Sequence, residues 1–389
     1  MRVIQLVDKL NSGGGVPSFV YDLCLALKEA GCNITLVGIL KNDSDEKAPF
    51  KELQAAGINI IEINAPSKKK AITNYIPKLR RTIKNIANKE QTVLNMHLKL
   101  SVLMGCLASI GLNNVKCVET YHNTYLNYHL QFNALRPFIK KYITVSETSR
   151  LELINEFHAP EKKVVAAPNG IDRKKIRKIA GEPIKHDYIS IVSVGRLSYE
   201  KNFAVSVDAL STICSPTVRY TLIGDGPDLE IVDVARHGNE NIILTGTLPR
   251  SEVLKHLASA DLVIMPSLWE GRSILQLEAM AFDVPLMISD VPGLREPFKE
   301  QALQEDELYR CCRFGYLVKT SDTSAYQEAM RVFLQNQSTW GSMKQCIREV
   351  SLENDIQMMI SIYLDVYKKI TINKSRLTKR AVFCEGEEK

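Results

Sequence analysis

The segment DLVIMPSLWEGRSILQLEAM, residues 261–280, decides the fold of this chain. It begins with an apolar run, Leu262–Met265, without polar alternation, as expected for a strand buried on both faces. A short loop follows, and the apolar spacing from Ile274 onward is helical. A buried strand that leads through a loop into a helix is part of a βαβ unit and predicts a parallel sheet.

The same alternation of strands and helices extends in both directions from this segment. We expect a first series of strands at Val3–Val7, Ile34–Ile39, Ile58–Ile63, Thr92–Met96, Lys116–Thr120, Tyr142–Val145 and Val164–Ala166. A second series is expected at Ile189–Val194, Tyr220–Ile223, Ile242–Leu244, Leu262–Met265, Leu286–Ile288 and Tyr316–Val318. The glycine-, proline- and charge-containing stretch 169–187 separates them. The sequence therefore predicts an α/β protein with two doubly wound, Rossmann-like domains that face a central cleft, where ligands bind.

Length and charge narrow the function classes. The chain has 389 residues, of which 45% are hydrophobic, so wholesale disorder is excluded. The net charge of +6 is unevenly distributed. Residues 1–184 carry 27 basic and 16 acidic residues (+11), and residues 185–389 carry 23 and 28 (−5). A basic first half indicates an anionic partner, which on this evidence is a nucleic acid, a membrane surface or a phosphorylated substrate.

The cysteines and the N-terminus predict a cytoplasmic protein. The nine cysteines form no C-x-x-C pair and lie mostly in apolar runs, which is typical of buried thiols in a reducing compartment. The N-terminus, MRVIQLVDKL, lacks the apolar core and cleavage site of a signal peptide. The longest apolar stretch, Leu100–Leu112, is shorter than the about 20 residues of a membrane-spanning helix.

Two further loops follow predicted strands. Asn11–Ser18 contains three consecutive glycines ahead of a helix, which suits an anion but also a plain tight turn; it is not G-x-G-x-x-G. In Gly195–Asn202, Arg196 and Lys201 are five residues apart and either converge on a diphosphate or form a solvated pair. In residues 266–280, Glu270 lies in the loop and Glu278 in the helix. Their carboxylates could accept hydrogen bonds from sugar and ribose hydroxyls. The alternative interpretation of this segment is a capped surface helix without a ligand.

These three segments, together with Pro168–Asp172 and Ile223–Pro227, resemble in order and spacing the retaining glycosyltransferases of family 4, which have the GT-B fold. Glu270 and Glu278 match the family's E-x7-E signature. The family's G-R-L…K-N segment is matched by Gly195, Arg196, Lys201 and Asn202. The resemblance covers roughly residues 1–370 and predicts fold and reaction class together.

The resemblance implies a role for each matched residue. Arg196 and Lys201 would bind the donor diphosphate, Glu278 the nucleotide ribose, and Glu270 hydroxyls of the transferred sugar. His122, at the end of a predicted strand, matches a family histidine near donor sugar and acceptor, although a buried core histidine is the alternative. With Arg196, Lys201 and Glu270 it forms the expected catalytic set. The expected donor-binding set is Gly14, Gly15, Gly195, Asn202, Thr247, Leu248, Gly271, Arg272, Ser273, Ile274, Leu275 and Glu278.

The resemblance also implies a division of labour between domains. Residues 1–180 would bind the acceptor and residues 181–350 the nucleotide sugar, and a helix in 351–372, around Asp355–Lys368, would cross back onto the first domain. The tail 373–389 is predicted to be poorly ordered.

Two residues depart from the family pattern. Arg272 with Ser273 replaces an aromatic or aliphatic residue followed by Gly or Pro, and Arg272 could enter the sugar pocket or approach the phosphates. Asp283 stands where the family usually has Gly, although Asp tolerates the left-handed conformation better than most residues. Both changes leave the preferred sugar open.

No metal cofactor is expected. His97 is a weaker second candidate site histidine, and the others (129, 158, 186, 237 and 256) have no metal-ligand spacing. No D-x-D motif ends a strand. Arg196, Lys201 and helix amides near Ile274 would stabilise the leaving diphosphate. The resemblance implies same-face attack on the sugar, assisted by the leaving phosphate.

Donor and acceptor are predicted from weaker signals. Residues 245–250 contain no carboxylate to recognise guanine, which favours a UDP-sugar. Lys68–Lys70 precede an amphipathic pattern with Ile72, Tyr75, Ile76, Leu79, Ile83 and Ile86 on one stripe, flanked by Lys78, Arg80, Arg81 and Lys84. Such a helix either lies on an anionic membrane or packs on the core with a solvated basic face. The membrane interpretation predicts peripheral binding to the inner face of the cytoplasmic membrane. It also predicts a lipid-linked saccharide acceptor, as in the assembly of bacterial surface polysaccharides such as capsule or lipopolysaccharide.

Three other functions are weighed against a glycosyltransferase. A GT-B sugar-nucleotide epimerase or phosphorylase would need catalytic acids or a cofactor lysine that these motifs do not indicate. A non-enzymatic sugar-nucleotide-binding protein is disfavoured by the diphosphate-type residues. Nucleic-acid binding lacks an aromatic-interleaved basic motif.

Overall fold

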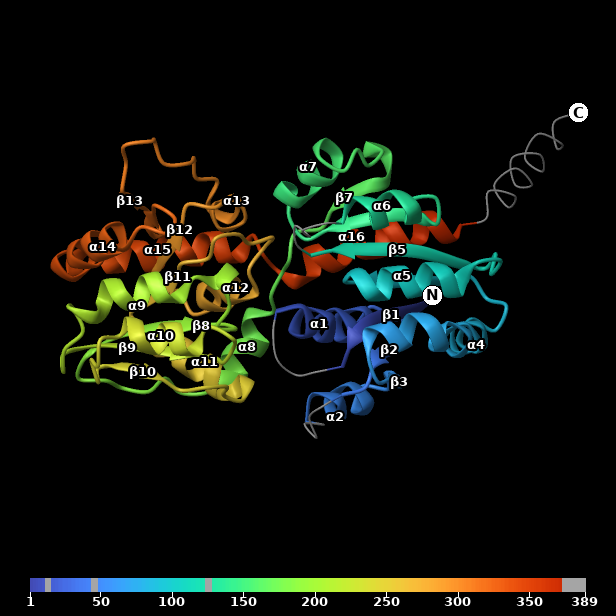
Figure 1. The fold of residues 1–389 in the computed structure, drawn as a ribbon, viewed down its shortest axis with the longest axis horizontal. Coiled ribbons are helices and arrows are strands. Elements are labelled where there is room, and N and C mark those ends of the chain that lie inside the picture. The colour runs from blue at the N-terminus through green and yellow to red at the C-terminus, as the bar shows by residue number, and fades with distance from the viewer. Residues whose placement is uncertain (11–14, 43–47, 123–127, 373–389) are drawn as a thin grey trace, which may run out of the picture.

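The computed structural model describes residues 1–10, 15–42, 48–122 and 128–372. The described chain forms two α/β domains, each with a seven-stranded sheet and helices on both faces (Figure 1). The predicted tail 373–389 lies outside the described residues.

The N-terminal domain is a wholly parallel sheet in the order β3-β2-β1-β4-β5-β6-β7. Its strands are β1 (Arg2–Lys9), β2 (Asn33–Leu40), β3 (Asn59–Ala65), β4 (Thr92–His97), β5 (Val115–Tyr121), β6 (Ile139–Thr144) and β7 (Val164–Ala166). Its helices are α1 (Gly15–Glu29), α2 (Ala48–Ala55), α3 (Lys68–Lys70), η1 (Ala71–Tyr75), α4 (Ile76–Ala87), α5 (Lys99–Ser109), α6 (His129–Leu135), α7 (Glu147–Asn155) and η2 (Glu161–Lys163). Separate apolar cores fill the two sides of this sheet.

The C-terminal domain has the order β10-β9-β8-β11-β12-β14-β13. Its strands are β8 (Ile189–Val194), β9 (Val218–Ile223), β10 (Ile242–Leu244), β11 (Leu262–Met265), β12 (Leu286–Ser289), β13 (Tyr309–Cys312) and β14 (Gly315–Val318). Its helices are α8 (Arg173–Ala180), η3 (Tyr199–Lys201), α9 (Phe203–Ser211), α10 (Leu229–Ala235), α11 (Arg250–Ala258), α12 (Ile274–Ala281), α13 (Pro292–Arg295), η4 (Glu296–Phe298), α14 (Thr323–Gln335), η5 (Gln337–Thr339) and α15 (Trp340–Leu352). In each sheet the strand order reverses beside the first strand, and this reversal creates a ligand-binding crevice at the carboxyl edge.

All thirteen predicted strands are present, and the predicted two-domain parallel fold is confirmed. The sequence missed β13, which pairs antiparallel with β14 through a tight hairpin. Its four residues, YRCC, are mostly half-buried or exposed and carry a charge, so they lack the continuous apolar run that marked the other strands.

The last helix, α16 (Ile356–Thr371), lies against the N-terminal domain (Figure 1). The Asp355 side chain caps it by accepting a hydrogen bond from the Gln357 amide at 2.7 Å. Met359, Tyr363 and Tyr367 are buried in the apolar core that α1 also lines. The two chain crossings between the domains touch, because the Ile171 amide donates to the Asn354 carbonyl at 2.9 Å.

The basic segment after β3 packs on the protein core. Leu79 and Ile83 of α4 are fully buried, and Tyr75, Ile76 and Ile86 are partly buried against the same core, whereas Ile72 is 38% exposed. The apolar stripe of this helix therefore packs on the core of the domain. Within the described residues, no helix is both long and apolar enough to cross a membrane.

Asp283 occupies the left-handed region expected of it, with φ of 62°. Its carboxylate also binds three guanidinium groups: Arg173 of α8 at 2.8 Å, Arg177 of α8 at 2.7 Å and Arg348 of α15 at 3.0 Å. The residue that replaces the family's usual glycine therefore joins two helices to the turn before β12.

Candidate functional site

The loops after β8, β9 and β10 are joined at the carboxyl edge of the second sheet. The Gly195 amide donates to the Ile223 carbonyl at 2.9 Å, and the Gly224 amide donates to the Gly246 carbonyl at 2.9 Å. Gly224 has φ of 146°, and a Cβ there would lie 1.8 Å from the Gly195 carbonyl oxygen. Only glycine fits this position, so the loop that carries Arg196 depends on it.

Lys201 and Glu270, which are 69 residues apart in sequence, form an ion pair at this edge. Lys201 ends the short turn η3, and Glu270 follows β11. The Ser267 hydroxyl also donates to Glu270 Oε1 at 3.1 Å, and the Glu270 side chain is only 9% exposed. The structure thus brings together two residues of the predicted catalytic set.

Asn202 and Arg196 lie on the same loop as Lys201. Asn202 has φ of 52° and donates from Nδ2 to the Ser321 hydroxyl at 3.3 Å, which ties the turn to the loop after β14. Arg196 is exposed, and no ion-pair partner for it exists among the residues that the structure describes. Its guanidinium is therefore an exposed cation in the loop that follows β8.

The start of α12 faces the start of α1 across the domain boundary. Ser273 caps α12, and its hydroxyl lies 3.5 Å from the Gln276 amide. The Ile274 side chain packs against apolar residues of both domains, and a Cβ built on Gly15 would lie 3.9 Å from it. Gly14, the other predicted glycine, lies outside the described residues. The amides at the start of α12 thus lie at the boundary between the two domains, next to Gly15.

The loop before α12 rests on a glycine that the sequence reasoning missed. A Cβ on Gly293 of α13 would lie 2.1 Å from the Glu270 carbonyl oxygen, so the Glu270–Gly271 backbone needs glycine at this position. Gly271 is buried and Leu275 is half-buried. The segment Pro292–Arg295 has one charged residue, Arg295, and no motif spacing, so nothing in its sequence marked Gly293 as a site residue.

Glu278 is buried beside two residues that were not predicted. Its Oε1 lies 3.1 Å from the Arg250 guanidinium, which also lies 3.3 Å from Asp22 of α1. Burial raises the pKa of Glu278 to about 7, although Arg250 opposes this shift. Thr247 is exposed and Leu248 half-buried in the preceding loop. A carboxylate from the opposite domain, Asp22, thus faces the segment where residues 245–250 supply none.

His122 and His97 are hydrogen bonded inside the N-terminal domain, at the ends of β5 and β4. Their facing nitrogens, His122 Nε2 and His97 Nδ1, are 2.9 Å apart. Burial lowers the pKa of His122 to about 3, and it lowers the pKa of His97 well below its usual value. Phe19 of α1 covers His122 edge-on, with ring centroids 5.0 Å apart. Both histidines are therefore neutral at physiological pH and lie beneath the helix that begins at Gly15.

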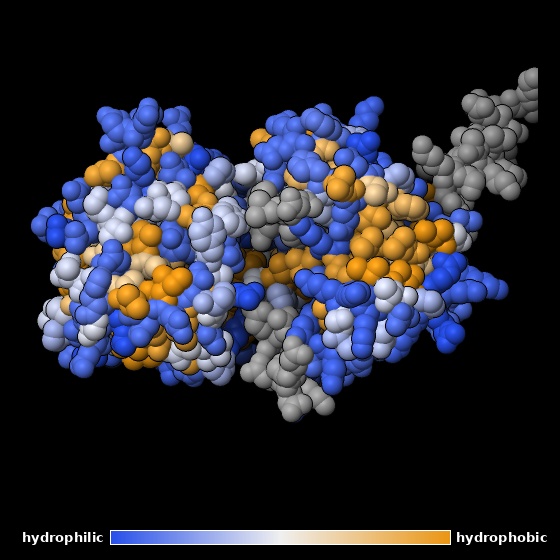
Figure 2. Space-filling model, in the orientation of Figure 1, coloured by the Kyte–Doolittle hydropathy of each residue, from blue (hydrophilic) through white to orange (hydrophobic). Residues whose placement is uncertain are grey.

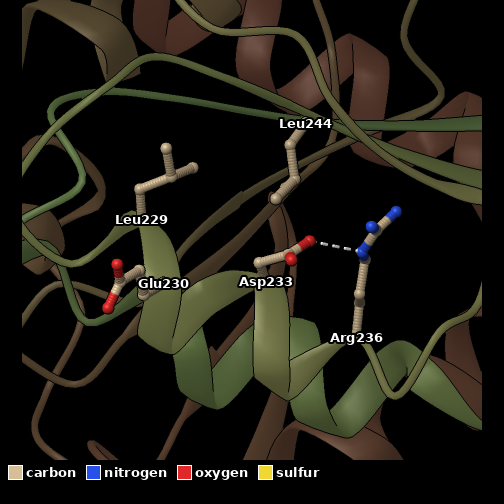
Figure 3. Close-up of a pocket in the computed structure, with 5 residues that line it drawn as sticks. All are labelled: Leu229, Glu230, Asp233, Arg236 and Leu244. Carbon is tan, nitrogen blue, oxygen red and sulfur yellow. Dashed lines mark ion pairs between the residues drawn. The ribbon is translucent and has the colours of Figure 1, made fainter.

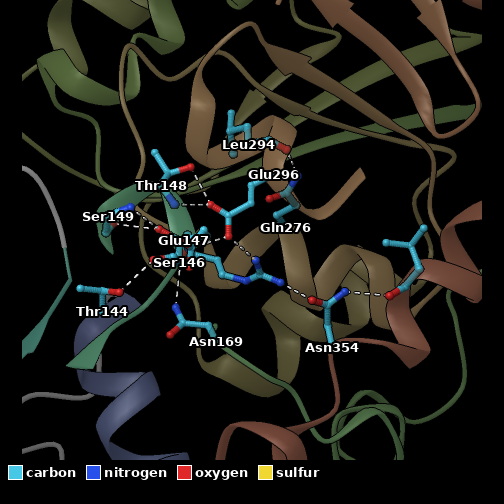
Figure 4. A network of polar contacts seen from close by, with 12 residues as sticks. Thr144, Ser146, Glu147, Thr148, Ser149, Asn169, Gln276, Leu294, Glu296 and Asn354 are labelled. Carbon is cyan, nitrogen blue, oxygen red and sulfur yellow. Dashed lines mark hydrogen bonds and ion pairs between the residues drawn. The ribbon is translucent and has the colours of Figure 1, made fainter. Parts of the chain in front are cut away.

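Arg272 has different partners from the sugar or phosphate that the sequence suggested. Its buried guanidinium contacts Glu296 at 3.3 Å and also hydrogen bonds to Asn354. Glu296 accepts from the amides of Glu147 and Thr148, both at 2.9 Å, at the start of α7 in the other domain (Figure 4). Arg272 thus belongs to a polar network that joins the two domains.

Two further observations concern binding sites elsewhere. The described residues contain no cluster of three or more His, Cys, Asp or Glu side chains that could hold a metal ion. A hollow on the outer edge of the C-terminal domain is lined by Leu229, Glu230, Asp233, Arg236 and Leu244, with Asp233 and Arg236 paired at 2.6 Å (Figure 3). None of the predicted site residues lines it.

Comparisons with known proteins cover both halves of the chain. Residues 13–175 match the family model described as Glycosyltransferase Family 4, and residues 173–350 match the model described as Glycosyl transferases group 1. A putative teichuronic acid biosynthesis glycosyltransferase of Bacillus subtilis is 32% identical over 126 residues, which are 32% of this chain and 30% of that protein. The UDP-Gal:alpha-D-GlcNAc-diphosphoundecaprenol alpha-1,3-galactosyltransferase of Escherichia coli is 23% identical over 57% of this chain and 58% of its own length.

The match to these two curated relatives therefore spans less than two thirds of the length of either one. Solved structures match over nearly the whole chain. The Anabaena protein Alr3699/HepE, solved with UDP-glucose, superposes with a TM-score of 0.75 at 16% identity, over 95% of this chain and all of that one. Two family models that together span residues 13–350, on a GT-B fold, show that the chain belongs to the glycosyltransferases of family 4.

Proposed function

We propose that this chain is a retaining glycosyltransferase that moves a sugar from a UDP-sugar to a hydroxyl of a lipid-linked saccharide. The observation that carries the proposal is the convergence of Lys201, Glu270 and the start of α12 at the carboxyl edge of the second sheet, facing Gly15 of the first domain. A cation, a sugar-binding carboxylate and free helix amides are the groups that a nucleotide-diphosphate sugar requires.

In the proposed reaction the bond from the anomeric carbon to the diphosphate oxygen breaks, and the acceptor oxygen bonds to the same face of that carbon. The acceptor proton passes to the leaving diphosphate. Arg196, Lys201 and the α12 amides would stabilise the charge that develops on the leaving group, which is the largest catalytic task, and the proposal assigns no role to a metal.

Two observations support UDP as the nucleotide. Residues 245–250 contribute no carboxylate, and the nearest one across the cleft, Asp22, already contacts Arg250 and Lys175, the latter at 3.5 Å. The E. coli relative is named for UDP-Gal, and the Anabaena structure holds UDP-glucose.

Three observations support an acceptor held at an anionic membrane. The E. coli relative is named for a diphosphoundecaprenol-linked acceptor, and residues 1–184 carry the excess positive charge. Hydrophobic side chains gather over α5 on one face of the N-terminal domain (Figure 2). Ile110, directly after α5, is 48% exposed, and Leu130 of α6, which contacts α5, is 88% exposed. Arg80 hydrogen bonds to the last carbonyls of α5, and Arg81 is exposed on α4 beside it. An apolar surface with adjacent cations suits a membrane interface.

Nucleotide release tests the enzymatic part of the proposal. UDP-sugars and GDP-sugars would be incubated with undecaprenyl-diphosphate-linked saccharides, and the anomeric configuration of any product would be read by NMR. We expect UDP release and a product with the configuration of the donor. Release of GDP but not UDP would overturn the donor assignment, and an inverted product would overturn the retaining mechanism.

Liposome co-sedimentation tests the membrane part separately. We expect binding to vesicles that contain phosphatidylglycerol but not to pure phosphatidylcholine. Leu130→Asp and the triple variant Lys68→Glu, Lys69→Glu, Lys70→Glu should each reduce binding. Binding that is insensitive to both variants would contradict the proposed surface.

A further inference from the structure

We propose that His97 is a positioning residue, which holds His122 as a neutral ring protonated on Nε2, so that Nδ1 alone remains to accept a hydrogen bond from a substrate hydroxyl. The last clause rests on the proposed function. The protonation state itself follows from the buried polar network around the two histidines.

The two rings share one proton along their contact. His97 Nδ1 and His122 Nε2 are 2.9 Å apart, and the residues are 0% and 5% exposed. At this distance one nitrogen donates and the other accepts, because two protonated nitrogens would clash and two lone pairs would repel. The partner of the second His97 nitrogen therefore decides which ring donates.

That partner is Gln5. His97 Nε2 lies 2.8 Å from Gln5 Oε1, which can only accept, and 3.2 Å from Asn95 Nδ2, which can only donate. The shorter contact, to Gln5, is the one that places the proton, and Asn95 Nδ2 has its own acceptor in Gln5 Oε1 at 2.8 Å. His97 consequently carries its proton on Nε2, and its Nδ1 is the acceptor toward His122. His122 must then donate from Nε2. Among the described residues no hydrogen-bond partner of His122 Nδ1 is found, so this nitrogen keeps its lone pair for a ligand.

A chain of hydrogen bonds orients Gln5. Asn95 Nδ2 donates to Gln5 Oε1 at 2.8 Å, and the Thr120 hydroxyl donates to Asn95 Oδ1 at 3.0 Å. Thr120 in turn lies 3.2 Å from the Tyr363 hydroxyl on α16. Helix α16 is thus linked to His122 through a series of buried hydrogen bonds, and each side chain in the series has a hydrogen-bond partner.

The network has a chemical consequence for the proposed reaction. A second proton on His122 would have to enter a site from which burial excludes charge. His122 therefore meets a sugar or acceptor hydroxyl as a hydrogen-bond acceptor and is not the acid that protonates the leaving group. This role agrees with a mechanism in which the diphosphate itself receives the proton.

Nitrogen NMR tests the protonation state without any substrate. Long-range proton–nitrogen spectra of the full ¹⁵N-labelled chain at pH 7 distinguish the two neutral tautomers and the charged ring. Disappearance of one of the seven histidine patterns in His122→Gln assigns the residue. We expect Nε2 protonated and Nδ1 unprotonated on both His97 and His122. A proton on His122 Nδ1, as in the inverted network with both amides turned, or a charged ring, would overturn the proposal.

Two matched variants test the positioning role. His97→Asn keeps an acceptor oxygen where Nδ1 lies, whereas His97→Leu removes it. We expect His97→Leu to lose the single tautomer of His122 and to lower kcat by about 10- to 100-fold with a much smaller change in the donor KM, as for partners that orient other functional histidines. His97→Asn should retain both the tautomer and most of kcat.

An unchanged His122 tautomer in His97→Leu would overturn the positioning role. If that variant does not fold, Gln5→Leu removes the acceptor that fixes His97 and is read in the same way. Because the spectra need neither donor nor acceptor, they stand even if the proposed sugar transfer fails, and the kcat readout alone depends on it.

Discussion

At the scale of single residues, Lys201 carries the sharpest expectation. Lys201→Ala removes a cation next to Glu270 and, in the proposed mechanism, a contact to the leaving diphosphate. We expect kcat to fall by about 10²- to 10³-fold, because charge stabilisation in the transition state is lost. The melting temperature should change little. Lys369→Ala, which removes an exposed helical lysine paired with Asp365, is the matched control and should leave the rate unchanged.

Glu119 gives a pH prediction that is independent of catalysis. Its side chain is buried, accepts a hydrogen bond from the Tyr128 hydroxyl at 2.7 Å, and its Oε2 has no partner among the described residues. Burial raises its pKa from 4.5 to about 7. The folded state therefore binds more protons than the unfolded state between about pH 4.5 and 7, and the free energy of unfolding falls as pH rises through this window.

Glu119→Gln should remove that dependence while it keeps the acceptor for Tyr128. We expect wild type to lose roughly 1–3 kcal/mol of stability relative to the variant between pH 5 and 8, on the scale of 1.36 kcal/mol per pKa unit. Urea unfolding at both pH values measures the difference. If the free energy of unfolding depends on pH in the same way in both proteins, ionisation of Glu119 does not destabilise the folded state, and the prediction is wrong.

At the same scale, the sequence predicted residue types better than residue partners. The ion pair of Lys201 with Glu270 joins two matched motifs. Arg272 turns instead to Glu296 and Asn354, and Glu278 lies beside Arg250, because both partners come from segments far away in sequence. Contacts of this kind depend on how the loops are stacked at the sheet edge, and local spacing contains no information on that.

At the scale of elements, Asp283 joins the α12–β12 turn to α8 and α15 through three arginines. Asp283→Gly relieves the positive φ but leaves these guanidinium groups without their shared carboxylate. We therefore expect a loss of roughly 1–3 kcal/mol in the free energy of unfolding, measured by urea titration. Asp283→Asn keeps the tolerance for the left-handed region and isolates the effect of charge. A more stable glycine variant would mean that backbone strain outweighs the ion pairs.

Strands buried on both faces were predictable because continuous apolar runs leave little choice of structure. The edge strand β13 and the π-helical turn Ala71–Tyr75 were not, since each is stabilised by its neighbours rather than by its own pattern. The amphipathic stripe of α4 shows the same limit. Its periodicity fixed a helix with one apolar face, but only the packed domain shows that the sheet covers that face.

At the scale of the whole molecule, Arg272 and Glu296 couple the domains. Glu296 accepts hydrogen bonds from the start of α7 in one domain while it pairs with Arg272 in the other. We expect Arg272→Met to lower the free energy of unfolding by roughly 1–3 kcal/mol, because Glu296 loses its buried cation. Calorimetry should show one unfolding transition in wild type and two in the variant. In the double variant with Glu296→Gln the losses should be less than additive, whereas full additivity would contradict a shared network.

The uneven charge of the two halves of the chain can be assigned to the two domains. Residues 185–389 carry a net charge of −5, yet the second domain places individual cations, Arg196 and Lys201, at the proposed donor site. The positive excess belongs to the first domain, which carries the exposed apolar residues over α5 and α6. Overall composition indicated an anionic partner, and the two domains divide the charge between a proposed donor side and a proposed acceptor side.

In the proposed function, the region between Gly15 and the start of α12 binds a nucleotide diphosphate through Lys201. Isothermal titration calorimetry with UDP on wild type, Lys201→Ala and Lys369→Ala tests it directly. We expect saturable binding to wild type and to Lys369→Ala, and affinity at least tenfold weaker in Lys201→Ala. Equal affinity in all three proteins, or no binding of UDP to wild type, would contradict it.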